Sequence, residues 1–287
     1  MKLIGAVTEG SGAVNEDGWG YIGTPDDVSA AWVLDGVTGI NGKNYLSSGT
    51  DAAWLVERAY KHLLKLAALD VSLREIMSRL IQFLIVDWRD SAKGVDLPEN
   101  YDPPAACLIL AKRYGDSWHT ARLGDSSLLA RAAEGERTIL VASPNNAFDR
   151  WLAAEAAKRR AAGARDSKIL LAEFQPQLAQ GRKLRNKAGG YSILEANISA
   201  LEFAEYLDLG KPSEIMLCTD GYFRAVDHYA LYSEAGVLDA SLVKGGVNSV
   251  LEEIRAVEAA DPNCVKYPRF KPADDATAVV LRQSARS

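Results

Sequence analysis

The sequence predicts an α+β fold built in layers, and two observations support this prediction. Short apolar runs of the strand type recur along the chain, bounded by glycine, proline and other turn residues. Between them lie longer segments whose apolar residues recur at helical spacing. Runs of strands interrupted by pairs of helices are typical of sheets that carry helices on one face.

The composition is that of an ordinary globular protein. Of 287 residues, 48% are hydrophobic and 25% are charged, and 33 Lys and Arg against 38 Asp and Glu leave a net charge of −5. This acidic balance argues against a nucleic-acid partner, which needs concentrated positive charge. No stretch approaches the roughly 20 apolar residues of a membrane span. Three cysteines without Cys-x-x-Cys spacing favour a reducing cytoplasm: Cys107, Cys218 and Cys264.

The first third of the chain predicts three strands followed by two long helices. The strands cover 2–7, 19–22 and 30–34. After a glycine-rich loop, Thr50 or a nearby serine is expected to cap the first helix. The second helix begins after the capping box Ser72-Leu-Arg-Glu75 and continues with apolar residues at helical spacing to Trp88.

The rest of the chain predicts more strands and one insertion. The predicted strands are 105–111, which forms a hairpin with 117–123, then 214–219 and 276–281. An amphipathic helix is expected over 247–259. Segment 145–188 is rich in Ala, Arg and Lys, with a helix around 151–162, and we interpret it as an inserted flap. Its basic clusters, Lys158-Arg159-Arg160 and Arg182-Lys183 with Arg185, are expected on solvated helix faces.

Acidic residues stand beside the ends of several predicted strands. Strand ends are rigid, so carboxylates placed there are held in a fixed mutual geometry. Glycines after Asp35 and Asp220 let the backbone approach a ligand closely. Hard divalent cations such as Mg²⁺ and Mn²⁺ prefer oxygen ligands of this kind. Each acidic motif alone is typical of an ordinary turn, and the five together are informative because their order and flanking residues match a family pattern.

The ordered set resembles the metal-dependent protein serine/threonine phosphatases of the 2C type, the PPM superfamily, in a divergent bacterial branch. The motifs that carry the resemblance are Asn15-Glu16-Asp17, Val33-Leu34-Asp35-Gly36, Gly124-Asp125-Ser126, Leu217-Cys218-Thr219-Asp220-Gly221 and Asp274-Asp275-Ala276-Thr277. The resemblance covers residues 1–283. It implies one domain over 1–287, a four-layer α-β-β-α sandwich of two antiparallel sheets flanked by helix pairs, with the flap at about 145–188.

The resemblance also implies a centre of two to three Mn²⁺ or Mg²⁺ ions. Asp35 would bridge two of the ions, and Gly36 would offer its carbonyl oxygen. The other acidic residues would complete the centre: Asp220 and Asp274 at one ion, Asp17 with Glu16 near it at the other, Asp125 at a third, and Asp275 positioning a water.

The activity that the resemblance implies is hydrolysis of phosphoserine and phosphothreonine in proteins. A water activated by the two metals would attack phosphorus without a phospho-enzyme, and the catalytic set would be Asp35, Asp220 and Asp274. The expected substrate is a protein phosphorylated by a serine/threonine kinase, and the expected enzyme is a cytoplasmic monomer with no nucleic-acid or membrane partner.

The substrate-binding residues depart from the family pattern. The family's phosphate-binding arginine falls at Gly12, so its replacement stays open among Arg122, Arg182 and Arg224. Val37 follows the first Asp-Gly where eukaryotic members have a histidine, so no general acid is assigned. These losses favour an alternative of a different class, a weak or inactive pseudophosphatase that regulates by binding a phosphoprotein. Retention of the clustered carboxylates favours the enzyme, because they repel one another unless a cation neutralises them.

Overall fold

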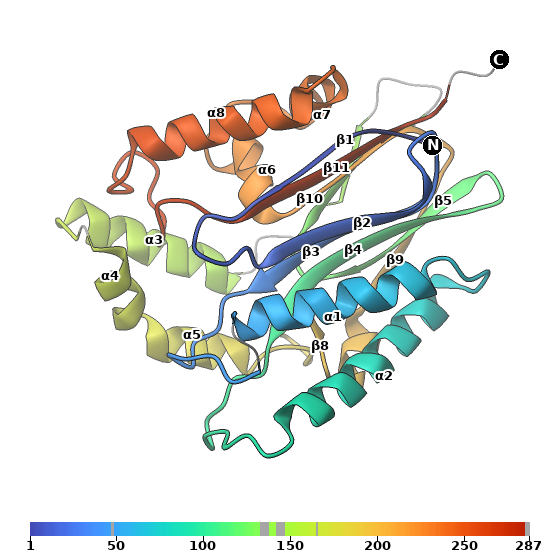
Figure 1. Cartoon of the computed structure of the whole chain (residues 1–287). Coiled ribbons are helices and arrows are strands. Elements are labelled where there is room, and N and C mark those ends of the chain that lie inside the picture. Colours follow the sequence, from blue (N-terminus) through green and yellow to red (C-terminus); the bar gives the residue numbers. More distant parts are fainter. Residues whose placement is uncertain (47–48, 133–137, 142–146, 165, 285–287) are drawn as a thin grey trace.

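Two antiparallel β-sheets lie face to face, and helices cover the outer side of each (Figure 1). The structure is a computed structural model that describes residues 1–46, 49–132, 138–141, 147–164 and 166–284. The predicted layered α+β class is therefore confirmed, as a four-layer α-β-β-α sandwich.

The first sheet contains the strands that precede and follow the two long helices, α1 (Asp51–Leu66) and α2 (Leu73–Ala92), in the sequence. Its order is β2-β3-β4-β5-β9, and the short β8 pairs with β4. The bounds are β2 Asp17–Thr24, β3 Asp27–Val37, β4 Ala105–Tyr114, β5 Ser117–Leu123, β8 Leu194–Glu195 and β9 Glu205–Gly210.

The second sheet joins the two ends of the chain. Its order is β1-β11-β10-β6-β7, with β1 antiparallel to β11. The bounds are β1 Lys2–Glu9, β6 Ser127–Ala132, β7 Thr138–Val141, β10 Pro212–Cys218 and β11 Ala276–Arg282.

The central strands β3 and β4 of the first sheet are buried on both faces, which explains their nearly continuous apolar sequences. In β3, Trp32 and Leu34 face the helices, whereas Ala31 and Val33 face the other sheet. The second sheet supplies Leu217 and its neighbours to the same inter-sheet core. Because side chains alternate along a strand, one apolar run serves both layers.

Two groups of helices complete the layers. Helices α1 and α2 cover the first sheet, and the hydroxyls of Thr50 and Ser72 accept the expected N-cap hydrogen bonds. The second sheet is covered by α6 (Asp220–Asp227), α7 (Glu234–Leu242) and α8 (Gly246–Ala260). No helix among the described residues combines the length and apolar composition needed to cross a bilayer.

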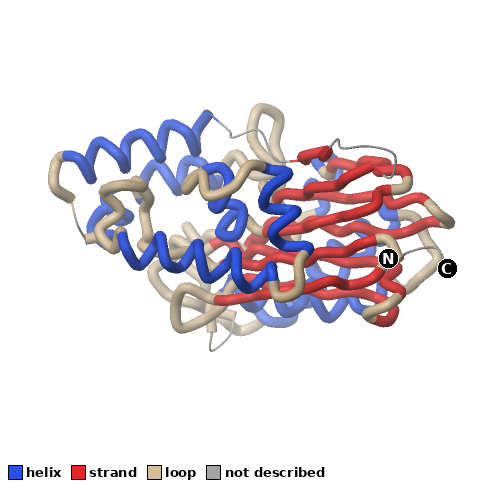
Figure 2. The backbone as a smooth tube through the Cα atoms, turned by 90° about the horizontal axis from the view of Figure 1, so that it is seen from above, coloured by secondary structure: helices blue, strands red, loops and turns tan. Residues whose placement is uncertain are grey.

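Three helices between β7 and β8 lie beyond one end of the sheets, away from the two termini (Figure 2). They are α3 (Ala147–Ala161), α4 (Ser167–Glu173) and α5 (Gln175–Arg182), followed later by the 3₁₀ helix η1 (Ile198–Phe203). We call α3 to α5 the flap. Its small core contains Leu152, Leu170 and Phe174, against which Phe270 packs.

The flap differs from its predicted form in two ways. One helix was predicted there, and the flap contains three. Its basic clusters are not all on solvated faces, because Arg160 and Arg185 are buried, at 1% and 6% exposure. Residues 145, 146 and 165 of the predicted segment lie outside the described residues.

Candidate metal centre

A row of three polar side chains crosses the end of the first sheet. Asp17 on β2 pairs directly with Asp35 on β3, and Asp35 pairs directly with Cys107 on β4. All three lie an even number of residues from inter-sheet core residues on their own strands, such as Val33, so they share the inter-sheet face. Residues directly opposite in such a ladder have Cβ atoms about 4.5–5.5 Å apart.

The second sheet and its connections bring the remaining acidic residues to the same place. Asp220 is the first residue of α6 and is separated from β10 only by Thr219, and Asp274 and Asp275 directly precede β11. Asp125 lies in the turn between β5 and β6. These residues lie at or beside strand ends on the same side of the two sheets. Five segments that are distant in sequence therefore come together there.

Two glycines allow this convergence. A Cβ atom on Gly36 would lie 2.5 Å from the carbonyl oxygen of Glu16, and the Gly36 N–H donates to that oxygen at 3.0 Å. A Cβ atom on Gly221 would lie 1.9 Å from the carbonyl oxygen of Asp275. The Asp-Gly dipeptides are therefore sites of close backbone approach.

Hydrogen bonds fix several of the carboxylates. Asp275 accepts bonds from the backbone N–H and hydroxyl of Ser11, at 2.7 and 2.9 Å, and from the Glu16 N–H at 2.7 Å. The Thr219 hydroxyl donates to Asp17 Oδ2 at 2.9 Å, which joins the two sheets. Thr38 donates to Glu16 Oε2 at 2.6 Å, whereas the buried Glu16 Oε1 has no hydrogen-bond partner among the described residues.

The centre holds an excess of buried negative charge. Burial, followed by repulsion from Asp17 and the other carboxylates, raises the pKa of Asp35 well above its ordinary value. Burial likewise raises the pKa of Asp17 to about 8 and that of Asp220 to about 7. At Asp274 burial acts in the same direction, but the charges of Arg224 and Lys271 prevail and lower the pKa.

This donor set suits hard divalent cations. It consists of carboxylate and carbonyl oxygens, one of which, Glu16 Oε1, is buried without a partner in the described part of the chain. The raised pKa values of Asp17, Asp35 and Asp220 mean that the site takes up protons or cations to reduce repulsion. A bound cation would give Glu16 Oε1 a partner and would reduce the repulsion between the carboxylates.

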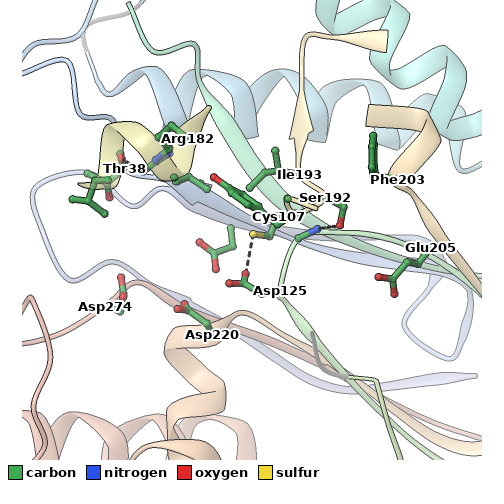
Figure 3. A pocket seen from close by; sticks show the side chains of 18 of the residues that line it. Thr38, Cys107, Asp125, Arg182, Ser192, Ile193, Phe203, Glu205, Asp220 and Asp274 are labelled. Carbon is green, nitrogen blue, oxygen red and sulfur yellow. Dashed lines mark hydrogen bonds between the residues drawn. The ribbon is translucent and has the colours of Figure 1, made fainter. Parts of the chain in front are cut away.

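Four of the carboxylates border a cavity of about 590 Å³: Asp35, Asp125, Asp220 and Asp274. Asp220 and Asp274 lie on one side, and Thr38 and Arg182 lie on the other (Figure 3). Lys271 also lines the cavity and forms an ion pair with Asp274. The cavity therefore combines a carboxylate cluster with cationic side chains, an arrangement that suits an anion bound next to metal ions.

The three candidate arginines occupy different positions. Arg182, at the end of α5, lines the cavity, and its Nη2 donates to the Thr38 carbonyl at 3.0 Å. Its buried Nη1 makes no hydrogen bond within the described ranges. Neither other candidate lines the cavity, because Arg122 pairs with Glu205 at 2.6 Å and Arg224 with Asp274 at 2.5 Å. Gly12 is exposed, with no heavy atom within 4 Å of a Cβ built on it.

Sequence reasoning missed two residues of the cavity wall. Cys107 was considered only as a free thiol, because its position opposite Asp35 depends on the pairing of β3 with β4, which the sequence did not predict. Lys271 gave a weaker signal, a lysine three residues before Asp274 in a loop. Both contact predicted metal residues: Cys107 donates a hydrogen bond to Asp125, and Lys271 forms an ion pair with Asp274.

The chain belongs to the protein phosphatase 2C family, whose sequence model matches residues 4–243. This is a family of protein serine/threonine phosphatases, as the order of the acidic motifs predicted. A search of curated protein sequences gave no significant match.

Solved structures of bacterial serine/threonine phosphatases share the fold. PstP/Ppp of Mycobacterium tuberculosis has a TM-score of 0.58 and 13% identity, with 98% of each chain covered. Stp1 of Staphylococcus aureus has a TM-score of 0.55 and 12% identity, covering 98% of this chain and 94% of that one. The catalytic domain of PstP in complex with two manganese ions has a TM-score of 0.53 and 14% identity, covering 96% and 95%.

Proposed function

We propose that this chain is an active, metal-dependent phosphatase that hydrolyses phosphoserine and phosphothreonine in proteins. The observation that carries the proposal is the cross-strand pair of Asp17 and Asp35 beside a cavity that Asp35, Asp220 and Arg182 line. Carboxylates in this number are costly to keep in a fold without a cation. Membership of a phosphatase family supports the same conclusion.

The proposed metal ligands are the oxygens at the sheet ends. Asp35 would contact two ions, with the Gly36 carbonyl and Asp17 at one and with Asp220 and Asp274 at the other. Glu16 and Asp275 would position waters, and Asp125 would hold a third ion. When bound, two Mn²⁺ or Mg²⁺ ions would supply a water nucleophile at neutral pH and neutralise the phosphoryl oxygens. The two manganese ions of the PstP complex support this assignment by analogy.

The cavity residues of the chain have complementary tasks. Arg182 would bind the phosphoryl group through its Nη1, which has no hydrogen-bond partner among the described residues and lies 3.8 Å from Asp102 Oδ2 in an ion pair. Guanidinium groups bind phosphate through several N–H donors. Burial raises the pKa of Cys107 well above its ordinary value, so its thiol is a poor nucleophile. The poor nucleophilicity of the Cys107 thiol is consistent with a water nucleophile and no phospho-enzyme.

The proposed substrate is a phosphorylated protein produced by a serine/threonine kinase. The flap forms one wall of the cavity through Leu178, Gly181 and Arg182, so it would contact residues near the phosphoryl group. Three free cysteines agree with a reducing cytoplasm. We propose a monomer without nucleic-acid or membrane partners.

The second candidate is a regulator that binds a phosphoprotein without hydrolysing it. It is favoured by Gly12, which stands where the family's phosphate-binding arginine falls, and by the pairing of Arg122 and Arg224 with carboxylates. In that case the metal centre would stabilise the fold and help to bind the phosphoprotein.

One experiment separates the two candidates. Protein stripped with EDTA is assayed for p-nitrophenyl phosphate hydrolysis and thermal melting, with and without added Mn²⁺ or Mg²⁺. Turnover that depends on metal and resists okadaic acid and vanadate supports the phosphatase, and phosphoserine and phosphothreonine peptides then define the substrate. Metal-induced stabilisation without turnover supports the regulator. The absence of both turnover and metal-induced stabilisation would contradict both candidates.

A further inference from the structure

We propose that Cys107, Asp125 and Asp35 form a binding site for a thiophilic divalent cation of the Zn²⁺ class. One donor atom from each residue lies within 4.8 Å of the other two. Such a site differs in kind from an all-oxygen centre for Mg²⁺ or Mn²⁺, because its wall includes a sulfur atom. The inference concerns binding and does not require turnover.

The backbone holds the three donors in place. Cys107 and Asp35 are directly paired across β3 and β4, so their side chains leave the sheet on the same face. The Cys107 Sγ lies 3.0 Å from Asp125 Oδ1, to which it donates a hydrogen bond (Figure 3). Gly124 makes this contact possible, because a Cβ atom at that position would lie 2.4 Å from the sulfur.

The spacing of these donors suits zinc. A tetrahedral ion with Zn–S of about 2.3 Å and Zn–O of about 2.0–2.2 Å has donors about 3.3–3.7 Å apart. The Sγ–Oδ1 distance of 3.0 Å is slightly shorter than this range, and all three donor atoms lie within 4.8 Å of one another. Three protein ligands leave the fourth position open to the cavity, which all three residues line.

The chemistry of binding is an exchange of a proton for a metal ion. The S–H bond of Cys107 breaks, the proton passes to solvent, and sulfur and the two carboxylates bind the cation. No oxidant or reductant takes part. Thiolates favour borderline and soft cations, whereas carboxylates alone favour hard ones, so Cys107 gives the site its selectivity.

The charges around the three donors also favour a cation. Asp35 stands directly opposite Asp17 across β2 and β3, and the basic residues Arg224 and Lys271 both pair with Asp274. The negative charge around Asp35 and Asp125 is therefore left for an external cation. No other group of three such donors occurs among the described residues, and Cys218 is fully buried in the core of the second sheet.

Sharing Asp35 has a functional consequence, which rests on the proposed function. An ion held by Cys107 and Asp35 competes for the carboxylate that would bridge the two catalytic cations. Zn²⁺ should therefore inhibit turnover supported by Mn²⁺, and the inhibition should depend on the thiol.

The test uses Cd²⁺, whose thiolate complexes have an ultraviolet charge-transfer band. Titration of the metal-free full chain should give this band at one equivalent in the wild type and in the control variant Cys264→Ser. Cys107→Ser should lose the band, and Asp125→Asn should weaken Cd²⁺ binding by at least about tenfold. A missing band in the wild type, or an unchanged band in Cys107→Ser, would overturn the proposal.

Two further measurements keep the test decisive. Asp125 is exposed, so Asp125→Asn is expected to fold, and undiminished Cd²⁺ affinity in that variant overturns the site even if Cys107→Ser fails to fold. Zn²⁺ competition against Mn²⁺-supported p-nitrophenyl phosphate turnover should need at least about tenfold more Zn²⁺ in Cys107→Ser. The band is measured without substrate, so a catalytically inactive protein would contradict only the proposed function.

Discussion

Asp17 and Asp35 face each other directly across β2 and β3, a placement that destabilises an ordinary sheet because like charges oppose. Burial makes the repulsion stronger, since little solvent screens it. The metal-free fold therefore keeps a destabilising pair at this position, and relief of the repulsion is the physical basis of cation uptake.

Asp35→Asn tests this account. The substitution removes the central charge of the cluster, so the metal-free variant should melt at a higher temperature than the metal-free wild type. A gain of 1 kcal/mol corresponds to about 2–4 °C in a domain of this size class. Phosphatase turnover and the Mn²⁺-induced rise in melting temperature should both be lost. The measurement is a thermal melt with EDTA and with Mn²⁺, beside a p-nitrophenyl phosphate assay.

A surface substitution serves as the control. Asp90→Asn, on the exposed side of α2, should leave both melts and the turnover as in the wild type. Full turnover in Asp35→Asn would refute a role for this carboxylate in metal binding.

Arg182→Ala tests the proposed phosphate contact. Hydrogen bonds from a charged group contribute about 1.5–3 kcal/mol, so kcat/KM for a phosphopeptide should fall by about 10- to 100-fold. Arg182→Lys should recover part of the loss, because it keeps the charge without the paired N–H donors. Arg79→Ala, an exposed arginine paired with Glu75, is the control. Unchanged kcat/KM in Arg182→Ala would leave the cavity without its proposed phosphate ligand.

The residues of the centre were predictable to different degrees. Asp17, Asp35, Asp125, Asp220 and Asp274 each lie in or beside the end of a strand, and all except Asp17 line one cavity, whereas Asp17 pairs with Asp35 next to it. The partner of each was not predictable, because ion pairs such as Arg224 with Asp274 join segments far apart in sequence. Arg122 illustrates this limit, since only the position of β9 shows that it pairs with Glu205.

At the scale of elements, the flap is attached to the loop that leads to Asp274. Arg160 on α3 is buried and donates to the carbonyl oxygens of Arg269 and Phe270, at 3.2 and 3.1 Å. The Phe270 ring packs against Phe174 of the flap, with ring centroids 5.4 Å apart. These contacts therefore join the flap directly to the loop that carries Asp274.

Arg160→Met should loosen the flap. The substitution keeps an apolar side chain of similar length but leaves buried carbonyl groups without donors, at a cost of about 1–3 kcal/mol each. Amide hydrogen exchange in α3 to α5 should become at least about tenfold faster, while α1 and α2 keep their protection. Lys158→Ala is the matched control, because Lys158 is exposed and its surface ion pair with Glu155 lies within α3 and contributes little. Equal exchange in both variants would contradict the anchoring role of Arg160.

The same loop should give the protein an acid-sensitive contribution to stability. Asp261 accepts bonds from the Val265, Lys266 and Tyr267 N–H groups and from Arg269 Nη1. Burial would raise its pKa, but these donors prevail and lower the pKa to about 2, below the usual 3.8. A lowered carboxyl pKa stabilises the fold above pH 3.8, and this stability is lost as the pH falls toward 2.

The contribution is about 1–2 kcal/mol, and Asp261→Asn isolates it. In urea unfolding, the difference in free energy between wild type and Asp261→Asn should be complete at pH 5. It should shrink steadily between pH 4 and pH 2. A difference that stays constant over this range would show that the ionised carboxylate is not the stabilising form.

The elements with strong local signals were predicted, and those defined by tertiary contacts were not. Helices α1, α2 and α8 have long apolar stripes, and two of the three have side-chain caps, so the sequence predicts them. Helix α6 begins at Asp220-Gly221, which is also a common turn dipeptide, and its eight residues give little periodicity. Strand β9 is largely exposed and lacks an apolar alternation, so only its pairing with β5 defines it.

At the scale of the whole molecule, the candidate centre lies where the two sheets meet. Asp17 and Asp35 come from the first sheet, whereas Asp220 and Asp274 flank strands of the second. In the described residues, Thr219 bonds across this boundary to Asp17. Cations bound by all four carboxylates would therefore connect the sheets as well as neutralise them.

Metal addition should consequently stabilise the whole sandwich. A cation at 100 times its Kd contributes about 2.7 kcal/mol, which corresponds to a rise of about 5–10 °C in melting temperature. Amide exchange should slow at both sheets together, in β3 and in β10, because opening either one would break the metal centre. The measurement is hydrogen exchange with EDTA and with Mn²⁺, and Asp35→Asn is the control in which both effects should disappear. Protection confined to the first sheet would show that Asp220 and Asp274 take no part in binding, since cations held by Asp17 and Asp35 alone leave the second sheet free to open.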